Sequence, residues 1–207
     1  MLIDDIVSAA PVIAVIVLER AADAVPLARA LLAGGLPVIE VTLRTDAALE
    51  AIRAIAREVP QAIVGAGTVL DAADLSGARE AGAHFAVSPG TTPELLDSAA
   101  TSGFALLPGV MTPSDVIAAI AAGYDVLKFF PAVQAGGVDM LKAFAGPFPG
   151  VRFCPTGGIN LSNAPQFLAL PNVCCVGGSW ITLAASILAA DWDSVTQLAS
   201  QARRLRA

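Results

Sequence analysis

One of the two lysines of this chain stands inside an apolar run. Lys128 lies within Val126–Phe129 and is followed by Phe130 and Pro131. Lysine is seldom fully buried, and exclusion from water favours its neutral amine, which can attack a carbonyl carbon and form a Schiff base. The alternative is a lysine whose aliphatic stem lies along the surface while its ammonium reaches water. Apolar neighbours on both sides favour the buried, reactive lysine.

A carboxylate and a guanidinium alternate with apolar residues on a second expected strand, 38–43. Side chains on a strand point to opposite faces in turn, so Glu40, Thr42 and Arg44 share one face and the apolar residues between them share the other. If the apolar face packs on helices, the polar face points inward, where charges are costly unless they are paired or used. Two interpretations stay open from this strand alone, a structural Glu40–Arg44 ion pair or groups used in catalysis.

Two glycine pairs follow the last two expected strands. Gly157-Gly158 comes after Val151–Phe153, and Gly177-Gly178 comes after Val173–Val176, with Ser179 next. Glycine lets backbone N–H groups approach an anion closely, and barrel enzymes often bind phosphate at these two positions. Either pair alone would fit an ordinary turn, but their joint placement favours a phosphate site.

Short apolar strands alternate with helical segments along the whole chain. The helical segments include three that open with the N-cap residues Asp71, Thr92 and Thr112. This alternation predicts a parallel sheet with helices outside, either doubly wound or a (β/α)8 TIM barrel. Eight repeats favour the barrel, with a short N-terminal helix at 2–9 and a single domain over residues 1–207. The apolar runs are Val12–Val17, Val38–Leu43, Ala62–Gly65, Phe85–Val87, Ala105–Leu107, Val126–Phe129, Val151–Phe153 and Val173–Val176.

Composition restricts the class of partner. The net charge is −6 and there is no basic stripe, which argues against nucleic acid. Hydrophobic residues make up 56% and mean hydropathy is +0.70, which raises the question of a membrane. The longest uncharged stretch, Phe153–Ala190, is interrupted by Pro, Gly and Asn, and its best apolar piece, Trp180–Ala190, is about half the roughly 20 residues that a spanning helix needs. With an acidic start in place of a signal peptide, we expect a cytoplasmic protein.

The cysteines and the histidine do not form a metal pattern. Cys154, Cys174 and Cys175 contain no Cys-x-x-Cys pair, and His84 is the only histidine. No histidine stands at the catalytic end of a strand to activate a thiol. We therefore expect buried thiols that pack, a surface or packing role for His84, and no metal or other cofactor.

Seven motifs, in order along nearly the whole chain, resemble the 2-keto-3-deoxy-6-phosphogluconate (KDPG) aldolase family, which overlaps with 4-hydroxy-2-oxoglutarate aldolase. The motifs start at Glu40 (EVTLRT), Val64 (VGAGTV), Val87 (VSPG), Leu107 (LPGV), Leu127 (LKFFPA), Arg152 (RFCPTGG) and Val176 (VGGSW).

The resemblance implies a class I aldolase, an aldehyde-lyase of the Entner–Doudoroff pathway. Such an enzyme cleaves KDPG to pyruvate and glyceraldehyde 3-phosphate, acts also on 4-hydroxy-2-oxoglutarate, and needs no cofactor. The resemblance further implies a homotrimeric (β/α)8 barrel.

The same resemblance implies a role for each site residue. Lys128 would form the Schiff base and Glu40 would be the general acid/base. The implied substrate contacts are Arg44 for the pyruvate carboxylate, Thr68 near it, Phe130 beside the pyruvyl group, and Pro89 and Thr156; the implied phosphate contacts are Gly157, Gly158, Gly178 and Ser179. From the residues alone, Thr68 fits a loop cap equally well.

A few positions depart from the family pattern. Val133 stands where Glu is usual, Ala14 where Pro is common, and 181–183 and 186–188 are more apolar than expected. We expect a subunit contact at Trp180–Ala190 in a trimer or a larger assembly. The departures leave open an engineered or non-catalytic assembly protein on this scaffold. A phosphosugar isomerase or epimerase also stays open, because barrels that bind phosphate carry out many different reactions. The buried lysine argues against this alternative.

Overall fold

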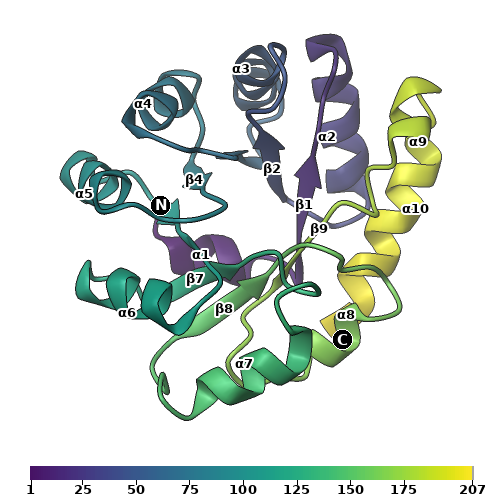
Figure 1. Cartoon of the computed structure of the whole chain (residues 1–207). Helices are drawn as coiled ribbons and strands as arrows, with labels where there is room; N and C mark the ends of the chain where they lie inside the picture. Colours follow the sequence, from purple (N-terminus) through teal and green to yellow (C-terminus); the bar gives the residue numbers. More distant parts are fainter. Residues whose placement is uncertain (207) are drawn as a thin grey trace.

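The computed structural model describes residues 1–206. Parallel strands occupy its centre and helices surround them (Figure 1). The strands are β1 Val12–Ile16, β2 Val38–Thr42, β3 Ile63–Gly67, β4 Phe85–Val87, β5 Leu106–Leu107, β6 Gly109–Val110, β7 Val126–Phe129, β8 Arg152–Pro155 and β9 Val176–Gly178. The helices are α1 Ile3–Ser8, α2 Ala24–Ala33, α3 Ala48–Glu58, α4 Ala72–Glu80, α5 Pro93–Ser102, α6 Pro113–Ala121, α7 Gly137–Ala145, α8 Ala164–Leu168, α9 Ala184–Leu188 and α10 Trp192–Arg203, with 3-10 turns at Ala21–Asp23 and Arg204–Arg206.

The strands lie in two parallel sheets, in the orders β5-β4-β3-β2-β1-β9 and β6-β7-β8. The prediction of parallel strands with helices outside is thus confirmed, while the prediction of eight strands in one sheet is only partly met. The fifth expected strand, Ala105–Leu107, corresponds to β5, and a short strand that the sequence did not predict, β6, follows after Pro108, whose missing N–H cannot join a ladder. The last strand also begins later than expected, at Val176, so Gly177 and Gly178 lie inside β9 and not in a loop after it.

Two buried apolar clusters explain the hydropathy of the chain. One lies between strands and helices and includes Ile39 and Val41 of β2. The other lies on the opposite side of the strands, where Val38, Phe85 and Val126 meet Ile6 and Val7 of α1. Because the strands are covered on both sides, they read as continuous apolar runs. The alternation predicted for β2 is therefore confirmed, with its apolar face toward the helices.

Side-chain caps start three of the helices where the sequence predicts them. Thr92 accepts from the N–H of Leu95 at 3.2 Å, and Thr112 accepts from that of Asp115 at 3.3 Å. Asp71 caps α4 in the same way. The five-residue helix α9 is not predicted by the sequence, because a helix of barely more than one turn has too few positions to show a period.

The uncharged tract 153–190 is cut into several short elements. It contributes β8, α8, β9 and α9, with turns between them. Within residues 1–206 no helix has the length and the apolar character to cross a bilayer.

Candidate active site

Glu40 and Lys128 form a buried pair. Lys128 Nζ lies 3.2 Å from Glu40 Oε1, with 5% of the lysine and 2% of the glutamate exposed. The two residues are 88 positions apart in sequence, and the fold brings them together because β2 and β7 face each other. A buried charge without a partner would be strongly unfavourable, so each group stabilises the other in this place.

The pairing decides between the two interpretations of the polar face of β2. The carboxylate of Glu40 contacts Lys128, and within the described residues Arg44 has no ion pair with it. Of the two open interpretations, the structural Glu40–Arg44 pair is the one that the structure does not contain, because β2 ends at Thr42 and Arg44, beyond the strand, is exposed. Arg44 Nε instead donates to Thr42 Oγ1 at 3.3 Å.

Glycines on neighbouring strands make room for the polar side chains. A Cβ added at Gly67 of β3 would overlap Glu40 Oε1, and one added at Gly177 of β9 would overlap Thr156 Oγ1. From the sequence, Gly177 is predicted only as part of a phosphate-binding pair and Gly67 only as part of a family motif, so the space that they leave for Thr156 and Glu40 is not predicted. A signal for this space existed, because a glycine inside a strand often marks the close approach of another group.

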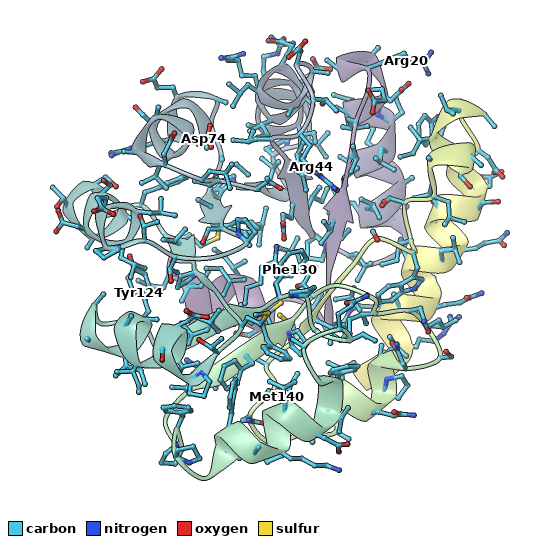
Figure 2. All side chains as sticks on the ribbon, in the orientation of Figure 1. Arg20, Arg44, Asp74, Tyr124, Phe130 and Met140 are labelled. Carbon is cyan, nitrogen blue, oxygen red and sulfur yellow. The ribbon has the colours of Figure 1, made fainter. Side chains whose placement is uncertain are left out.

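Phe130 and Arg44 line the carboxyl ends of two facing strands. The ring centroid of Phe130 lies 5.2 Å from Lys128 Nζ, a cation–π distance. Figure 2 shows Arg44 and Phe130 inside the ring of helices, whereas Asp74 and Met140 belong to that ring. Thr42 Oγ1 donates to the carbonyl of Ile16 at 2.9 Å, which ties the end of β2 to β1.

Thr68 and Pro89 follow β3 and β4, at the same edge of the sheet. Thr68 is half-buried and has φ +59°, a left-handed conformation that is uncommon outside glycine. Pro89 is also half-buried and follows the fully buried Ser88. Strained residues often stand at functional positions, which is consistent with a substrate contact at Thr68.

The candidate phosphate loop follows β8. Thr156 is buried, and Gly157 and Gly158 have φ of +102° and +74°, conformations that glycine adopts without strain. The loop is held by the segment that follows β7, because the N–H of Val133 donates to the Gly157 carbonyl at 3.1 Å. A Cβ on Gly158 would lie 2.8 Å from the Val133 side chain, so the close packing also requires glycine there.

The second half of the candidate phosphate site is β9 and the residue after it. Gly178 is buried beneath the ring of Trp180, which a Cβ at this position would overlap. Ser179 is exposed. An isolated bridge between Thr156 and Gly177 places the two glycine-rich segments side by side.

The three cysteines belong to the apolar cluster that packs on α1 or contact it, and they form no disulfide among the described residues. Cys154 is in β8 and Cys175 precedes β9, and both are buried in the inner cluster. Hydrogen bonds to the Cys154 and Cys174 thiols, together with burial, raise the pKa of Cys175 well above its ordinary value. A thiol held in its neutral form packs as a small apolar group. His84 is exposed.

A buried lysine paired with a carboxylate at the carboxyl ends of parallel strands, beside a glycine-rich anion loop, defines an enzyme site of the Schiff-base type. Comparison with known proteins narrows this class. The family model "KDPG and KHG aldolase" matches residues 3–198. The 2-dehydro-3-deoxy-phosphogluconate aldolase of Pseudoalteromonas atlantica is 52% identical over 96% of this chain and 92% of its own length.

Two solved structures are similar over almost their whole length. The KDPG aldolase of Legionella pneumophila, with pyruvate captured as a covalent carbinolamine, has a TM-score of 0.95 at 46% identity, covering 97% of each chain. The aldolase of Zymomonas mobilis ZM4 with 3-phosphoglycerate has a TM-score of 0.94 at 50% identity, covering 99% of this chain and 96% of its own. This chain belongs to the KDPG and KHG aldolase family.

Proposed function

We propose that this protein is a class I aldolase that cleaves KDPG to pyruvate and glyceraldehyde 3-phosphate. The observation that carries the proposal is the buried contact of 3.2 Å between Lys128 Nζ and Glu40 Oε1. A nucleophilic amine and a proton-transferring carboxylate are the two groups that Schiff-base cleavage requires.

The first half of the reaction builds the imine. The neutral amine of Lys128 attacks C2 of the keto acid, and the resulting carbinolamine loses water once its hydroxyl has been protonated. Glu40, within reach of the same nitrogen, gives and takes these protons directly or through one water. The product is an iminium ion on Lys128, which draws electrons away from C3.

The second half breaks the carbon–carbon bond. Glu40 accepts the proton of the C4 hydroxyl while the C3–C4 electron pair moves into the iminium, which releases the aldehyde and leaves an enamine. Protonation of the enamine at C3 and hydrolysis of the imine then release pyruvate and restore the amine. The ring of Phe130, whose centroid lies 5.2 Å from Lys128 Nζ, is placed to pack beside the bound pyruvyl group in this proposal.

Charged groups at the two ends of the substrate have matching partners in this proposal. Arg44, exposed at the end of β2, binds the pyruvyl carboxylate with Thr68, and Pro89 and Thr156 line the chain between. Gly157, Gly158, Gly178 and Ser179 hold the phosphate through N–H groups and a hydroxyl. The pyruvate and 3-phosphoglycerate in the two relatives support such ends, and the family name supports 4-hydroxy-2-oxoglutarate as a second substrate.

We also infer that the two sheets are parts of one closed (β/α)8 barrel in a single domain. Only Pro108 separates β5 from β6. Isolated bridges from Phe153 to Val173 and from Thr156 to Gly177 connect the β8 region with the approach to β9. A homotrimer, a cytoplasmic location and a role in the Entner–Doudoroff pathway stay predictions from the resemblance.

Borohydride trapping tests the proposed function on the two lysines of the chain. Pyruvate and borohydride should leave a reduced three-carbon adduct on Lys128, located by peptide mass spectrometry. Lys128→Ala should remove both adduct and cleavage, whereas Lys142→Ala is the matched control, because Lys142 is exposed and lies near the surface carboxylate of Asp139. An adduct confined to Lys142, or cleavage retained by Lys128→Ala, would refute the proposal.

A further inference from the structure

The strand beside Lys128 is interrupted where two sheets meet. β5 pairs with β4 up to Val87 and Leu107, and β6 pairs with β7, with Gly109 opposite Lys128. Between them stands Pro108, which has no N–H to donate. The interruption therefore falls one residue before the register partner of the lysine.

A serine side chain spans this interruption. In an unbroken parallel ladder the N–H of Gly109 would donate to the carbonyl of Ser88, because the N–H of Ser88 already donates to the Leu107 carbonyl at 3.3 Å. The acceptor in the structure is Ser88 Oγ, at 3.1 Å from the Gly109 nitrogen. Ser88 is fully buried, so this hydroxyl replaces a main-chain acceptor out of reach of water.

The segment 108–110, which Ser88 anchors, accepts two backbone hydrogen bonds from the lysine strand and the residue after it. The N–H of Lys128 donates to the Pro108 carbonyl at 2.8 Å, and the N–H of Phe130 donates to the Val110 carbonyl at 3.1 Å. Gly109 also packs directly on the backbone around Pro89, since a Cβ there would overlap it. One buried hydroxyl thus connects the end of β4 to β6, the strand that pairs with the lysine strand β7.

We infer that Ser88 is a positioning residue for the Schiff-base lysine, acting through the Gly109 N–H. Without the hydroxyl, a buried N–H loses its acceptor and the segment 108–110 must shift to find another. Lys128, which takes its backbone bonds from that segment, shifts with it relative to Glu40 on the far side. The inference rests on the proposed function, in which the placement of Nζ sets the rate of imine formation.

Ser88→Ala should lower kcat for KDPG cleavage on the order of tenfold, because small misplacements of reacting groups are costly. The KM for KDPG should stay within about twofold, since the groups proposed to bind its two ends are unchanged. The rate of borohydride trapping with pyruvate should fall by the same factor as kcat. Ser88→Cys fills the same volume with a weak acceptor and should behave like Ser88→Ala, which keeps the test available if the alanine variant folds poorly.

Thr196→Val is the matched control for lost stability. Thr196 Oγ1 donates to the carbonyl of Ala30 at 3.1 Å between α10 and α2, away from the lysine. This variant should lose stability in urea unfolding and keep kcat. An unchanged kcat in the Ser88 variants, or an equal loss of kcat in Thr196→Val, would overturn the inference while pyruvate trapping at Lys128 of the wild type still supports the proposed function. If the wild type traps no pyruvate at Lys128, both are overturned.

Discussion

At the scale of single residues, the site is a lysine and a glutamate that neutralise each other in a place that water hardly reaches. A buried pair of this kind contributes little net stability, because desolvation offsets most of the attraction. The proposed role of the pair is catalytic, because Lys128 forms the imine with the keto acid and Glu40 transfers the protons. Removal of one charge alone leaves the other buried without a partner, so a variant of this pair is tested for catalysis together with a measurement of its free energy of unfolding.

Glu40→Gln tests the glutamate. The amide keeps the shape and an acceptor for Lys128 but cannot take a proton, so kcat should fall about 10²–10⁴-fold. Steady-state cleavage of KDPG measures this, with borohydride trapping to show that Lys128 still reacts with pyruvate. Asp139→Asn is the control, since Asp139 and Lys142 form a second lysine–carboxylate pair on the surface. Wild-type turnover in Glu40→Gln would contradict the assigned role.

At the scale of the elements, strands position the groups and glycines leave the space for them. β3 pairs with β2 so that Glu40 is opposite Gly65 and Thr42 is opposite Gly67. The two glycines face large neighbours, because a Cβ at Gly65 would overlap the ring of Phe85 and one at Gly67 would overlap Glu40. The glycine at position 67 of β3 therefore leaves the space that the Glu40 carboxylate occupies.

Gly67→Ala should displace Glu40 and lower kcat on the order of 100-fold. The matched control is Gly77→Ala in α4, where the nearest atom to a new Cβ is Leu49 Cδ1 at 3.6 Å, an ordinary contact. That control should keep kcat and raise the free energy of unfolding by about 0.4–1 kcal/mol, because alanine loses less entropy in a helix. Turnover and urea unfolding measure both variants. A Gly67→Ala protein with wild-type kcat would show that Glu40 does not need this space.

At the scale of the whole molecule, apolar surface remains on the outside. Leu188 of α9 is 70% exposed, and Leu183, just before α9, is 49% exposed. Both lie in Trp180–Ala190, where the sequence predicts a subunit contact. Ile117 of α6 is 59% exposed in a different part of the surface. Ile120 of α6 is also exposed, at 43%, so a comparison of variants on the two helices decides which of these apolar surfaces contacts another copy of the chain.

Light scattering of the purified protein tests the contact. The wild type should have the mass of three chains, and Leu188→Asp should shift it toward a single chain, because burial of a carboxylate in an apolar interface is unfavourable. Ile117→Asp, with a similar exposed side chain on α6, should leave the mass unchanged. A wild-type monomer would refute the predicted trimer, and dissociation by Ile117→Asp alone would place the contact on α6.

Much of the architecture was predictable because it depends on local patterns. The caps at Thr92 and Thr112 and the alternation on β2 need only neighbours in sequence. Harder to predict were the short strand β6 after Pro108 and the late start of β9, because strand ends depend on which partner supplies the hydrogen bonds. For the same reason the role of Ser88 could not be predicted, because its hydroxyl accepts a hydrogen bond only at the break between β5 and β6.

The sequence by itself determined which residues can do chemistry. One lysine inside an apolar run and one carboxylate on the polar face of an expected strand were visible without a fold, because the hydropathy of neighbouring residues and the alternation of side chains are local properties. The tertiary structure alone decided that Glu40 pairs with Lys128 and not with Arg44, which leaves the arginine exposed at the end of β2. The physical reason is distance along the chain. An i, i+4 neighbour on one strand competes with a partner 88 positions away, and only the packing of the strands around a common interior determines which of the two is nearer.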